Sequence, residues 1–353
     1  MTNNNYDAVE YIDIRDLWNR DGWNNPKERT NLNFIDLFSG AGGLSCGLVM
    51  AGFNPIANVE MMPEAVETFK YNFKDIKGFA GRIESRDITE QTTKEGLYEE
   101  VKGRKIDLIA GGFPCQGFSM AGKRALDDPR NYLYKEMFEI VNHLKPDFVI
   151  MENVAGLRSF YDGKIEKSII NAYEEIGYKI NVSVLNSVYY GVPQIRKRVI
   201  FIGNRIDKKI FFPKPLYNEN NFVTIGDAIL KYMDMPETPK INHIFTKHNK
   251  NTIERLKNVP EGGSLYPNYS DSWKKSPWDK PSCTIKENHG GVNIHPRLPR
   301  VLTPRELAEL QSFPDDFIFK GSKKWQLVQI GNAVPPLLGK AIGLAVRKSL
   351  QEK

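Results

Sequence analysis

The sequence predicts an α/β fold in which helices cover both faces of a mostly parallel sheet. Up to residue 203, short apolar and β-branched runs alternate with helical patterns, as expected when crossover helices join parallel strands. These runs are nearly continuous in apolar residues, which is typical of strands buried on both faces. A glycine-rich turn at 40–43 separates the first strand from the first helix. With 41% hydrophobic and 26% charged residues, the 353-residue chain can bury a full core.

Each expected element has a local reason. The run Phe34-Ile-Asp-Leu-Phe38 has the composition of a buried strand, and the helix at 63–73 starts with a proline, which suits a first turn. On the same criteria we expect strands at 34–38, 55–59, 106–110, 147–151, 179–185 and 199–203. We expect helices at 44–50, 63–73, 132–144 and 165–176.

The pattern changes at residue 204. Nine prolines and eleven asparagines occur in 204–298, where a helix is indicated only near 252–259. This segment holds 15 Lys/Arg against 10 Asp/Glu, so it carries most of the chain's small basic excess of 49 against 43. Helical signals return with a capping box from Thr303 to Glu306 and a last helix at 337–350. We therefore expect a polar extension at 1–31, an α/β domain formed by 32–203 and 299–353, and an irregular domain at 204–298.

Several classes of protein are excluded or disfavoured. No apolar run approaches the roughly 18 residues that a membrane span needs. The N-terminus lacks a basic start followed by an apolar stretch, so no secretory signal is expected. The three cysteines, Cys46, Cys115 and Cys283, show neither pairing nor metal-ligand spacing, so we expect no disulfide framework, no metal and a reducing cytoplasm.

Candidate cofactor-binding residues follow the first strands. Asp36 to Gly43 form a glycine turn between strand and helix, and Glu60 stands at the end of the next strand, where a carboxylate commonly binds ribose hydroxyls. Ser45 replaces the third glycine of a dinucleotide fingerprint, which disfavours NAD. Asp87 is a candidate partner for an adenine amino group, although an ordinary loop aspartate fits equally well.

Candidate catalytic residues follow the later strands. Cys115 lies in a glycine-flanked loop after the third strand, and Glu152 ends the next one, so both are expected at the same edge of the sheet. Arg196 and Arg198 alternate ahead of the last strand. Most lone cysteines are buried and inert, and alternate arginines are usually surface charge. The position and the neighbours of these residues favour a site.

The order of these motifs resembles that of the DNA cytosine-5 methyltransferases. The shared pieces are Phe34–Gly43, Glu60, Asp87, Pro114-Cys115-Gln116, Glu152-Asn153-Val154, Gln194-x-Arg196-x-Arg198, Arg300–Glu306 with Gln311–Pro314, and Gln329–Pro335. The resemblance implies a Rossmann-like, class I S-adenosylmethionine-dependent fold with 204–298 as a smaller target-recognition domain. It implies a bacterial or phage restriction-modification enzyme that methylates carbon 5 of a flipped cytosine in double-stranded DNA.

The resemblance also implies roles for individual residues. Cys115 would add to carbon 6 of the cytosine, Glu152 would act at ring nitrogen 3, and Arg198 with Arg196 would hold the carbonyl and the active-site loop. S-adenosylmethionine would contact Phe38, Gly40, Gly42, Glu60, Met61, Asp87, Ile88, Pro114, Leu133, Asn332 and Val334. DNA would contact Gln116, Ser119, Lys123, Arg124, Lys274 and Lys275, with Trp273 and Trp278 as further candidates that a core role suits as well.

Asn332 and Val334 imply that the C-terminal region folds back onto the first strand. We expect a monomer without a metal. Three alternatives remain open from the residues: an RNA (tRNA) cytosine-5 methyltransferase, a catalytically silent DNA-binding regulator, and an NAD-dependent oxidoreductase. The sizeable basic insert disfavours the first, the presence of both Cys115 and Glu152 disfavours the second, and Ser45 disfavours the third.

Overall fold

The computed structural model describes residues 9–19, 22–24, 29–76, 84–114, 133–266, 273–287 and 293–352. Its main sheet contains β2 (Asn33–Leu37), β3 (Asn54–Val59), β4 (Leu108–Gly111), β5 (Phe148–Val154), β6 (Lys179–Asn186) and β7 (Lys197–Asn204). The strand order is β3-β2-β4-β5-β7-β6. The first four strands in this order are parallel, and β7 is antiparallel to both of its neighbours. The mostly parallel sheet predicted from the sequence is confirmed.

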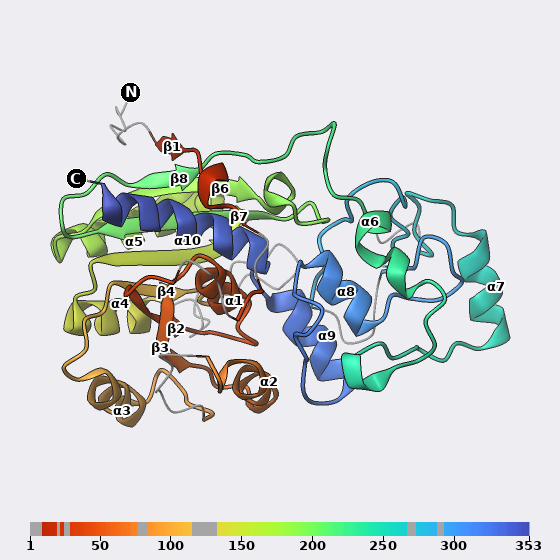
Figure 1. Cartoon of the computed structure of the whole chain (residues 1–353), viewed down its shortest axis with the longest axis horizontal. Helices are drawn as coiled ribbons and strands as arrows, with labels where there is room; N and C mark the ends of the chain where they lie inside the picture. The colour runs from red at the N-terminus through yellow and green to blue at the C-terminus, as the bar shows by residue number, and fades with distance from the viewer. Residues whose placement is uncertain are drawn as a thin grey trace.

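Helices cover both faces of this sheet (Figure 1). One face carries α1 (Gly43–Met50), α2 (Pro63–Phe73) and α10 (Pro336–Gln351), and the other carries α3 (Gln91–Val101), α4 (Leu133–Leu144) and α5 (Lys164–Glu175). Successive residues of a strand pack alternately against the helices on the two faces. In β2, for example, Phe34 packs with the first set of helices, and Ile35 and Leu37 pack with the second. The buried, two-sided strands explain the continuous apolar runs in the sequence.

The C-terminal helix α10 packs directly on the first helix α1 through glycines. A Cβ at Gly47 would lie 2.4 Å from the carbonyl oxygen of Pro336, and a Cβ at Gly343 would lie 2.8 Å from the Cβ of Ala51. No larger side chain fits at either position without moving backbone. The expected return of the C-terminal region to the start of the sheet is thus confirmed, and the sheet lobe is built from both ends of the chain.

A second lobe lies beside the sheet lobe and contains α6 (Ile225–Ile229), α7 (Lys250–Asn258), α8 (Pro304–Leu310) and α9 (Lys323–Asn332) (Figure 1). The apolar core of the sheet lobe continues into it, because Ile225 and Ile229 of α6 belong to the same buried cluster as Phe34 of β2. The outlying helix α7 has a small cluster of its own around Leu256. The predicted helix near 252–259 and the predicted capping box of α8 are both confirmed.

The N-terminal segment is integrated into the sheet lobe. β1 (Glu10–Ile12) pairs in parallel with β8 (Phe211–Pro213), which lies against α10. Trp23 is 4% exposed, packs on Phe73 and donates its indole N–H to Asp316 at 2.9 Å. The domain bounds expected from the sequence put 1–31 in an extension and residues 211–213 in the irregular domain. The described parts of both segments instead meet on the sheet lobe.

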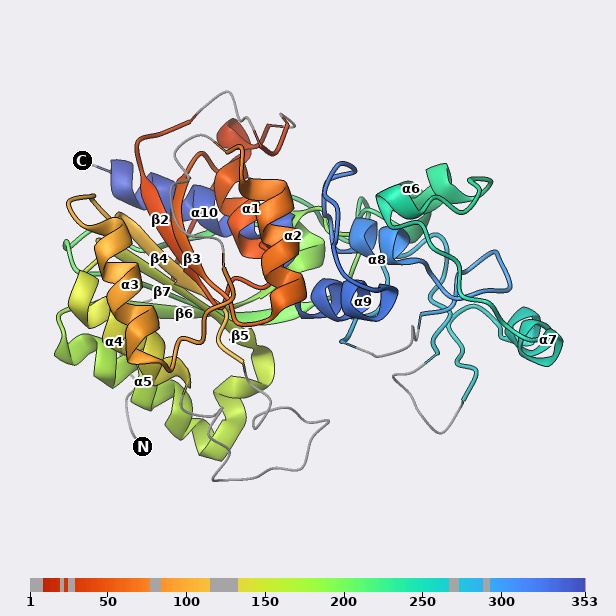
Figure 2. The ribbon, with the colours of Figure 1, turned by 90° about the horizontal axis from the view of Figure 1, so that it is seen from below.

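The helices α6 and α9 were not expected from the sequence. Among the residues that the structure describes, no helix is long and apolar enough to cross a membrane. Figure 2 shows that α2, α3, α4 and α5 lie around the same half of the molecule as the sheet, and that α8 and α9 lie between the sheet and α7. Ligands bind at the carboxyl ends of the parallel strands in such folds, so a site is expected at that edge of the sheet.

Candidate active site

The turn after β2 is held open by glycines and by Glu60. Phe38, Gly40 and Gly42 all have positive φ, with values of 57°, 54° and 93°. The Glu60 carboxylate at the end of β3 accepts the backbone N–H of Gly40 at 2.8 Å and that of Met62 at 2.7 Å. Burial raises the pKa of Glu60, and these two backbone donors oppose the rise. The predicted ribose-binding carboxylate thus lies against the glycine turn with a fixed orientation.

A second carboxylate lies behind the same turn. Asp36 in β2 is 1% exposed, and the hydroxyl of Ser45 donates to its Oδ2 at 2.5 Å. Burial is the main reason that the pKa of Asp36 rises to about 7, with Glu60 adding to the rise and Ser45 opposing it. In the sequence, Ser45 is informative only because it replaces the third glycine of a dinucleotide fingerprint. The structure explains the serine as the partner of Asp36.

The segment after α9 closes the other side of the turn. A Cβ at Gly43 would lie 2.3 Å from the carbonyl oxygen of Val334, so these two backbones are in direct contact. Val334 is 8% exposed, whereas Asn332 at the end of α9 is exposed. Residues about 290 positions apart in the sequence therefore lie side by side at this turn.

The remaining predicted cofactor contacts lie at the ends of neighbouring elements. Asp87 accepts the backbone N–H of Thr89 at 2.9 Å and its hydroxyl at 2.8 Å, which fixes the carboxylate next to buried Ile88. Met61 is 63% exposed, which is unusual for so apolar a side chain. Phe38 follows β2, Pro114 follows β4 and Leu133 starts α4, and all three are half-buried.

Glu152 and Arg198 meet at the carboxyl end of β5. Nε of Arg198 lies 2.7 Å from Oε1 of Glu152, and each side chain is 12% exposed. The other carboxylate oxygen would lie 3.1 Å from a Cβ at Gly112, so Glu152 lies against the backbone that leads to Pro114. The amide of Asn153 donates to the carbonyl of Phe113 at 3.2 Å and holds that backbone in place.

Arg196 does not lie in the same place as Arg198. It is 2% exposed, and its guanidinium donates to the carbonyl of Ile285 at 2.7 Å and to that of Gly331 at 2.9 Å. Burial, followed by the nearby charge of Arg198, lowers the pKa of Arg196, and Glu152 opposes the shift. The expected contact of Arg196 with the base is corrected accordingly: the guanidinium ties the sheet to the second lobe and to the end of α9.

Part of the predicted site lies outside the described residues. These positions are Cys115, Gln116, Ser119, Lys123 and Arg124. Pro114 is the last described residue before them, and the Glu152 carboxylate lies beside the backbone two positions earlier.

The DNA contacts expected in the second lobe divide into two kinds. Lys274 is half-buried. Lys275 is 6% exposed and donates its ammonium to the carbonyl of Leu256 at 2.9 Å, so it is a structural residue and the expected DNA contact is corrected. Trp278 packs against α6, where a Cβ at Gly226 would lie 2.6 Å from the indole nitrogen. Trp273 packs on the small cluster around Leu256. For both tryptophans the core role is the one that the structure supports.

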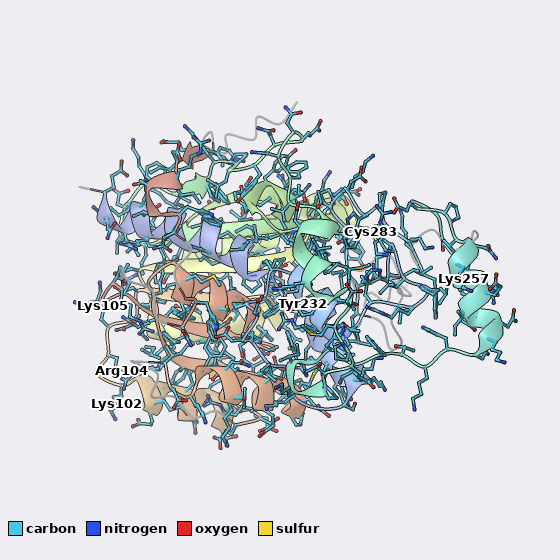
Figure 3. The ribbon with its side chains drawn as sticks, turned by 45° about the vertical axis from the view of Figure 1, so that its right-hand side comes forward. Lys102, Arg104, Lys105, Tyr232, Lys257 and Cys283 are labelled. Atoms are coloured by element: carbon cyan, nitrogen blue, oxygen red, sulfur yellow. The ribbon has the colours of Figure 1, made fainter. Side chains whose placement is uncertain are left out.

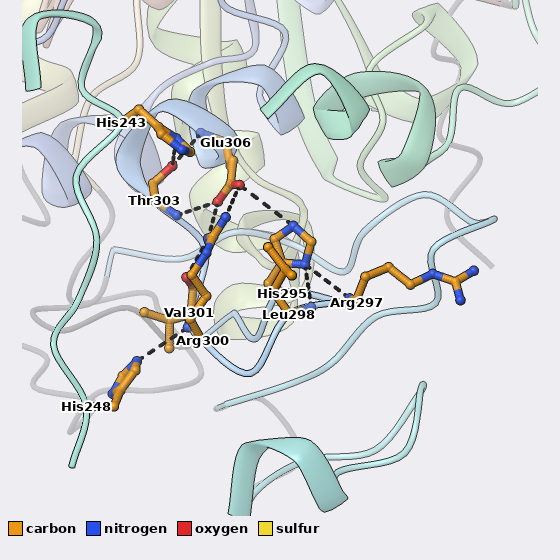
Figure 4. Close-up of polar contacts among 9 residues, drawn as sticks. All are labelled: His243, His248, His295, Arg297, Leu298, Arg300, Val301, Thr303 and Glu306. Carbon is orange, nitrogen blue, oxygen red and sulfur yellow. Dashed lines mark hydrogen bonds and ion pairs between the residues drawn. The ribbon is translucent and has the colours of Figure 1, made fainter. Parts of the chain in front are cut away.

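A buried polar cluster lies at the start of α8 and contains Arg300, Thr303 and Glu306 of the motif Arg300–Glu306 (Figure 4). Glu306 caps α8 with Thr303 and accepts two hydrogen bonds from Arg300, at 2.7 and 2.8 Å. His295 is fully buried, and its Nδ1 accepts the backbone N–H groups of Arg297 and Leu298, each at 3.1 Å. His243 bonds to Thr303 at 3.0 Å. Sequence reasoning found the capping box but missed both histidines, because only the fold brings them together.

Exposed cations lie at both ends of the molecule. Figure 3 places Lys257 on α7 at one end, and Lys102, Arg104 and Lys105 of the turn after α3 at the other. Lys105 is paired with Asp107 and Asp147.

Among the described residues, no group of three or more His, Cys, Asp and Glu side chains could hold a metal ion.

The comparisons with known proteins agree with this geometry. A family model described as C-5 cytosine-specific DNA methylase matches residues 32–348. The chain belongs to this family. Type II methyltransferase M1.HphI of Haemophilus parahaemolyticus is 42% identical to this methylase over 333 residues, which cover 90% of this chain and 87% of that protein. Type II methyltransferase M.XorII of Xanthomonas oryzae is 34% identical over 369 residues, covering 90% and 85%.

Solved structures support the same fold. A crystal structure of a prophage-encoded DNA modification methyltransferase from E. coli superposes on this methylase with a TM-score of 0.74 and 29% identity, covering 91% of this chain and all of that one. The S. pombe Dnmt2 methyltransferase has a TM-score of 0.64 at 17% identity and supports the fold alone. The methylase is thus a sequence-specific DNA cytosine-5 methyltransferase of the bacterial restriction-modification type, and it requires a methyl donor. The RNA-methylating, regulatory and oxidoreductase alternatives are not favoured.

Proposed function

We propose that this methylase uses S-adenosylmethionine as its methyl donor and Cys115 as a covalent nucleophile. The observation that carries the proposal is the Glu152–Arg198 pair, which lies beside the backbone leading to Pro114 and Cys115. A carboxyl group and a guanidinium that are fixed beside the backbone before Cys115 suit addition to a cytosine ring. The same edge of the sheet carries the glycine turn and Glu60.

The chemistry explains why a thiol is needed. Carbon 5 of cytosine is too weak a nucleophile to attack a methyl group directly. When the Cys115 thiolate forms a bond to carbon 6, the electron pair of the 5,6 double bond shifts and carbon 5 becomes nucleophilic. Bound S-adenosylmethionine would supply an electrophilic methyl group. After methylation, loss of the carbon 5 proton to a base restores the double bond, and the carbon–sulfur bond breaks.

Glu152 and Arg198 would stabilise the charge that develops during this addition. Glu152 would share a proton with ring nitrogen 3, and Arg198 would donate to the cytosine carbonyl oxygen. The 2.7 Å contact between them orients both groups before the base arrives. Arg196 would act only through position, because its donors are bound to the carbonyls of Ile285 and Gly331.

The residues around the glycine turn fit an adenosine cofactor. A Cβ at Gly40 would meet no atom within 4 Å, so open space borders the turn. Glu60 would bind the ribose hydroxyls, Asp87 the adenine amino group, and exposed Met61 and buried Ile88 the faces of the base. We propose Phe38, Gly42, Pro114, Leu133, Asn332 and Val334 as the other contacts.

DNA would bind with the target base flipped into the site, because carbon 6 is inaccessible in a stacked duplex. Gln116, Ser119, Lys123 and Arg124 would contact DNA near the extruded base, and Lys274 would contact it from the second lobe. We propose that the second lobe is the target-recognition domain and that it starts after β8, since β8 pairs with β1 on the sheet lobe. We further propose that the protein acts in the cytoplasm, because its Type II relatives come from bacteria. We also propose that it acts as a monomer, which can methylate the two strands of a site in successive binding events.

The direct test is methyl transfer from isotope-labelled S-adenosylmethionine to unmethylated plasmid DNA by wild-type and Cys115→Ser protein. The proposal expects label on cytosine carbon 5 with the wild type and none with the variant, while DNA binding by the variant persists. Methyl transfer by Cys115→Ser would contradict covalent catalysis, and a wild-type protein that binds no S-adenosylmethionine would contradict the cofactor.

A further inference from the structure

The N-terminus of α1 is capped by a carboxylate from another element. The N-cap residue of α1 is Gly42, which has no side chain to supply a cap. Asp36 of β2 fills this role, since its carboxylate accepts the hydroxyl of Ser45, the third residue of the helix, at 2.5 Å. The backbone N–H of Ser45 also hydrogen-bonds to Asp36. Asp36 is 1% exposed, so this is a buried contact.

Oxygen atoms around the glycine turn before α1 make this helix N-terminus less favourable for an anion. A helix N-terminus after a glycine turn normally attracts anions, and in dinucleotide-binding folds it holds a pyrophosphate. Here Asp36 takes donors of α1, and Glu60 takes the N–H of Gly40. The carbonyl oxygen of Val334 faces Gly43 from the other side. Three oxygens, two of them from carboxyl groups, therefore surround a place that would otherwise favour a phosphate.

We propose that Asp36 determines the charge class of the cofactor, by favouring a cationic sulfonium and disfavouring phosphate-bearing nucleotides. The inference rests on the proposed use of S-adenosylmethionine and deepens it. Asp36 acts here as a specificity-determining residue through its charge. It does not need to touch the cofactor, because the interaction of buried charges extends over several ångströms at low dielectric.

Two natural ligands isolate the charge. S-adenosylmethionine and S-adenosylhomocysteine share the adenine, the ribose and the amino acid, and they differ by one methyl group and one positive charge on sulfur. A residue that acts through its charge changes the ratio of their dissociation constants. A residue that only shapes the turn changes both constants by the same factor.

The experiment compares Asp36→Asn with the control variant Ser45→Ala by isothermal titration calorimetry at pH 8.5, which lies above the pKa of about 7 of Asp36. Asparagine retains an oxygen that can accept from Ser45 and removes the charge. Ser45→Ala removes the hydroxyl bond and retains the carboxyl group. ADP serves as the phosphate-bearing probe, and the thermal midpoint of each variant reports folding.

We expect Asp36→Asn to lower the preference for S-adenosylmethionine over S-adenosylhomocysteine by about tenfold, which is the effect of one partly screened charge. The same variant should bind ADP more tightly than the wild type does. Ser45→Ala should leave the preference within about a factor of two of the wild type.

Equal weakening of both ligands by Asp36→Asn, with no gain in ADP affinity, would overturn the inference while leaving the cofactor proposal intact. A wild-type protein that binds neither adenosyl compound would instead overturn the cofactor proposal itself. If Asp36→Asn fails to fold, Asp36→Glu offers a second measurement, because it retains the charge and should retain the preference.

Discussion

Nε of Arg198 lies 2.7 Å from Oε1 of Glu152, across the antiparallel pair that β5 and β7 form. The two residues are 46 positions apart in the sequence, and the register places Arg198 opposite Val154. Because β7 runs against β5, the start of β7 meets the carboxyl end of β5, where the site lies. A parallel β7 would have placed Arg198 at the far edge of the sheet.

Removing the acid of this pair should affect the chemical step. Glu152→Gln keeps the shape of the side chain and loses its ability to share a proton, so kcat should fall by about 10²-fold or more. Single-turnover methylation of plasmid DNA measures this step directly, and filter binding should show DNA affinity within a few-fold of the wild type. A Glu152→Gln enzyme with an unchanged single-turnover rate would be incompatible with the proposed role.

Arg196 and Arg198 form a matched pair for separating position from chemistry. Arg196→Met leaves two buried carbonyls without their donors, so the free energy of unfolding should fall by roughly 2–4 kcal/mol. Arg198→Met should change stability less and kcat more, because Arg198 is bound to Glu152 and to the exposed carbonyl of Lys197, whereas Arg196 is bound to two buried carbonyls. Denaturant titration and single-turnover rates of both variants test this. The opposite order of effects would show that the two assignments are exchanged.

Cofactor binding should release a proton from Asp36. Burial raises the pKa of Asp36 to about 7, so at pH 7 about half of the carboxyl groups are protonated. A cationic ligand favours the ionised form, so S-adenosylmethionine binding should release a fraction of a proton and weaken as pH falls below 7. Calorimetry in two buffers of different ionisation enthalpy measures the release. Equal release with S-adenosylhomocysteine, or an unchanged value in Asp36→Asn, would exclude Asp36 as the source.

His295 should make the protein sensitive to mild acid. Burial lowers the pKa of His295 from 6.5 to about 4, with Glu306 opposing the shift. Below pH 6.5 the His295 ring therefore binds a proton in the unfolded chain but stays neutral in the folded protein until the pH approaches 4. The stability contributed by the neutral ring is present above pH 6.5 and is lost as pH falls toward 4.

The measurement is the free energy of unfolding at pH 7 and pH 5. The wild type should lose about 2 kcal/mol more over this interval than His295→Asn does. Asparagine retains an oxygen that can accept from Arg297 and Leu298, and His243 titrates in both proteins. Identical losses in the two proteins would mean that His295 is already neutral in the unfolded chain or charged in the fold.

Most of the sheet lobe could be predicted from the sequence. The strands of the sheet are apolar on both faces, and the helices α2, α4 and α5 have one apolar side, so local patterns define them. The helix α9 was missed because its apolar residues form a weak pattern: it buries Gln326 and Gln329 beside Leu327 and Val328. Polar residues that are buried through long-range hydrogen bonds look like surface residues in a sequence.

The site was predicted better by motif order than by residue type. Glu60, Glu152 and Arg198 lie at the carboxyl edge of the sheet, where strand ends placed them. Lys275 was assigned by its charge and Arg196 by the motif that it shares with Arg198, and both are buried with carbonyl oxygens as partners. Charge alone cannot distinguish a cation that binds DNA from one that binds backbone carbonyls, because the difference depends on packing.

The proposed mechanism makes the Cys115 thiolate essential for methyl transfer to carbon 5 of cytosines at one DNA sequence. The most direct measurement is bisulfite sequencing of plasmid DNA from a methylation-free host that expresses either the wild type or Cys115→Ser. The account predicts protected cytosines within one recurrent short sequence for the wild type and complete conversion for the variant at equal expression. Complete conversion with soluble wild-type protein, or protection by Cys115→Ser, would contradict it.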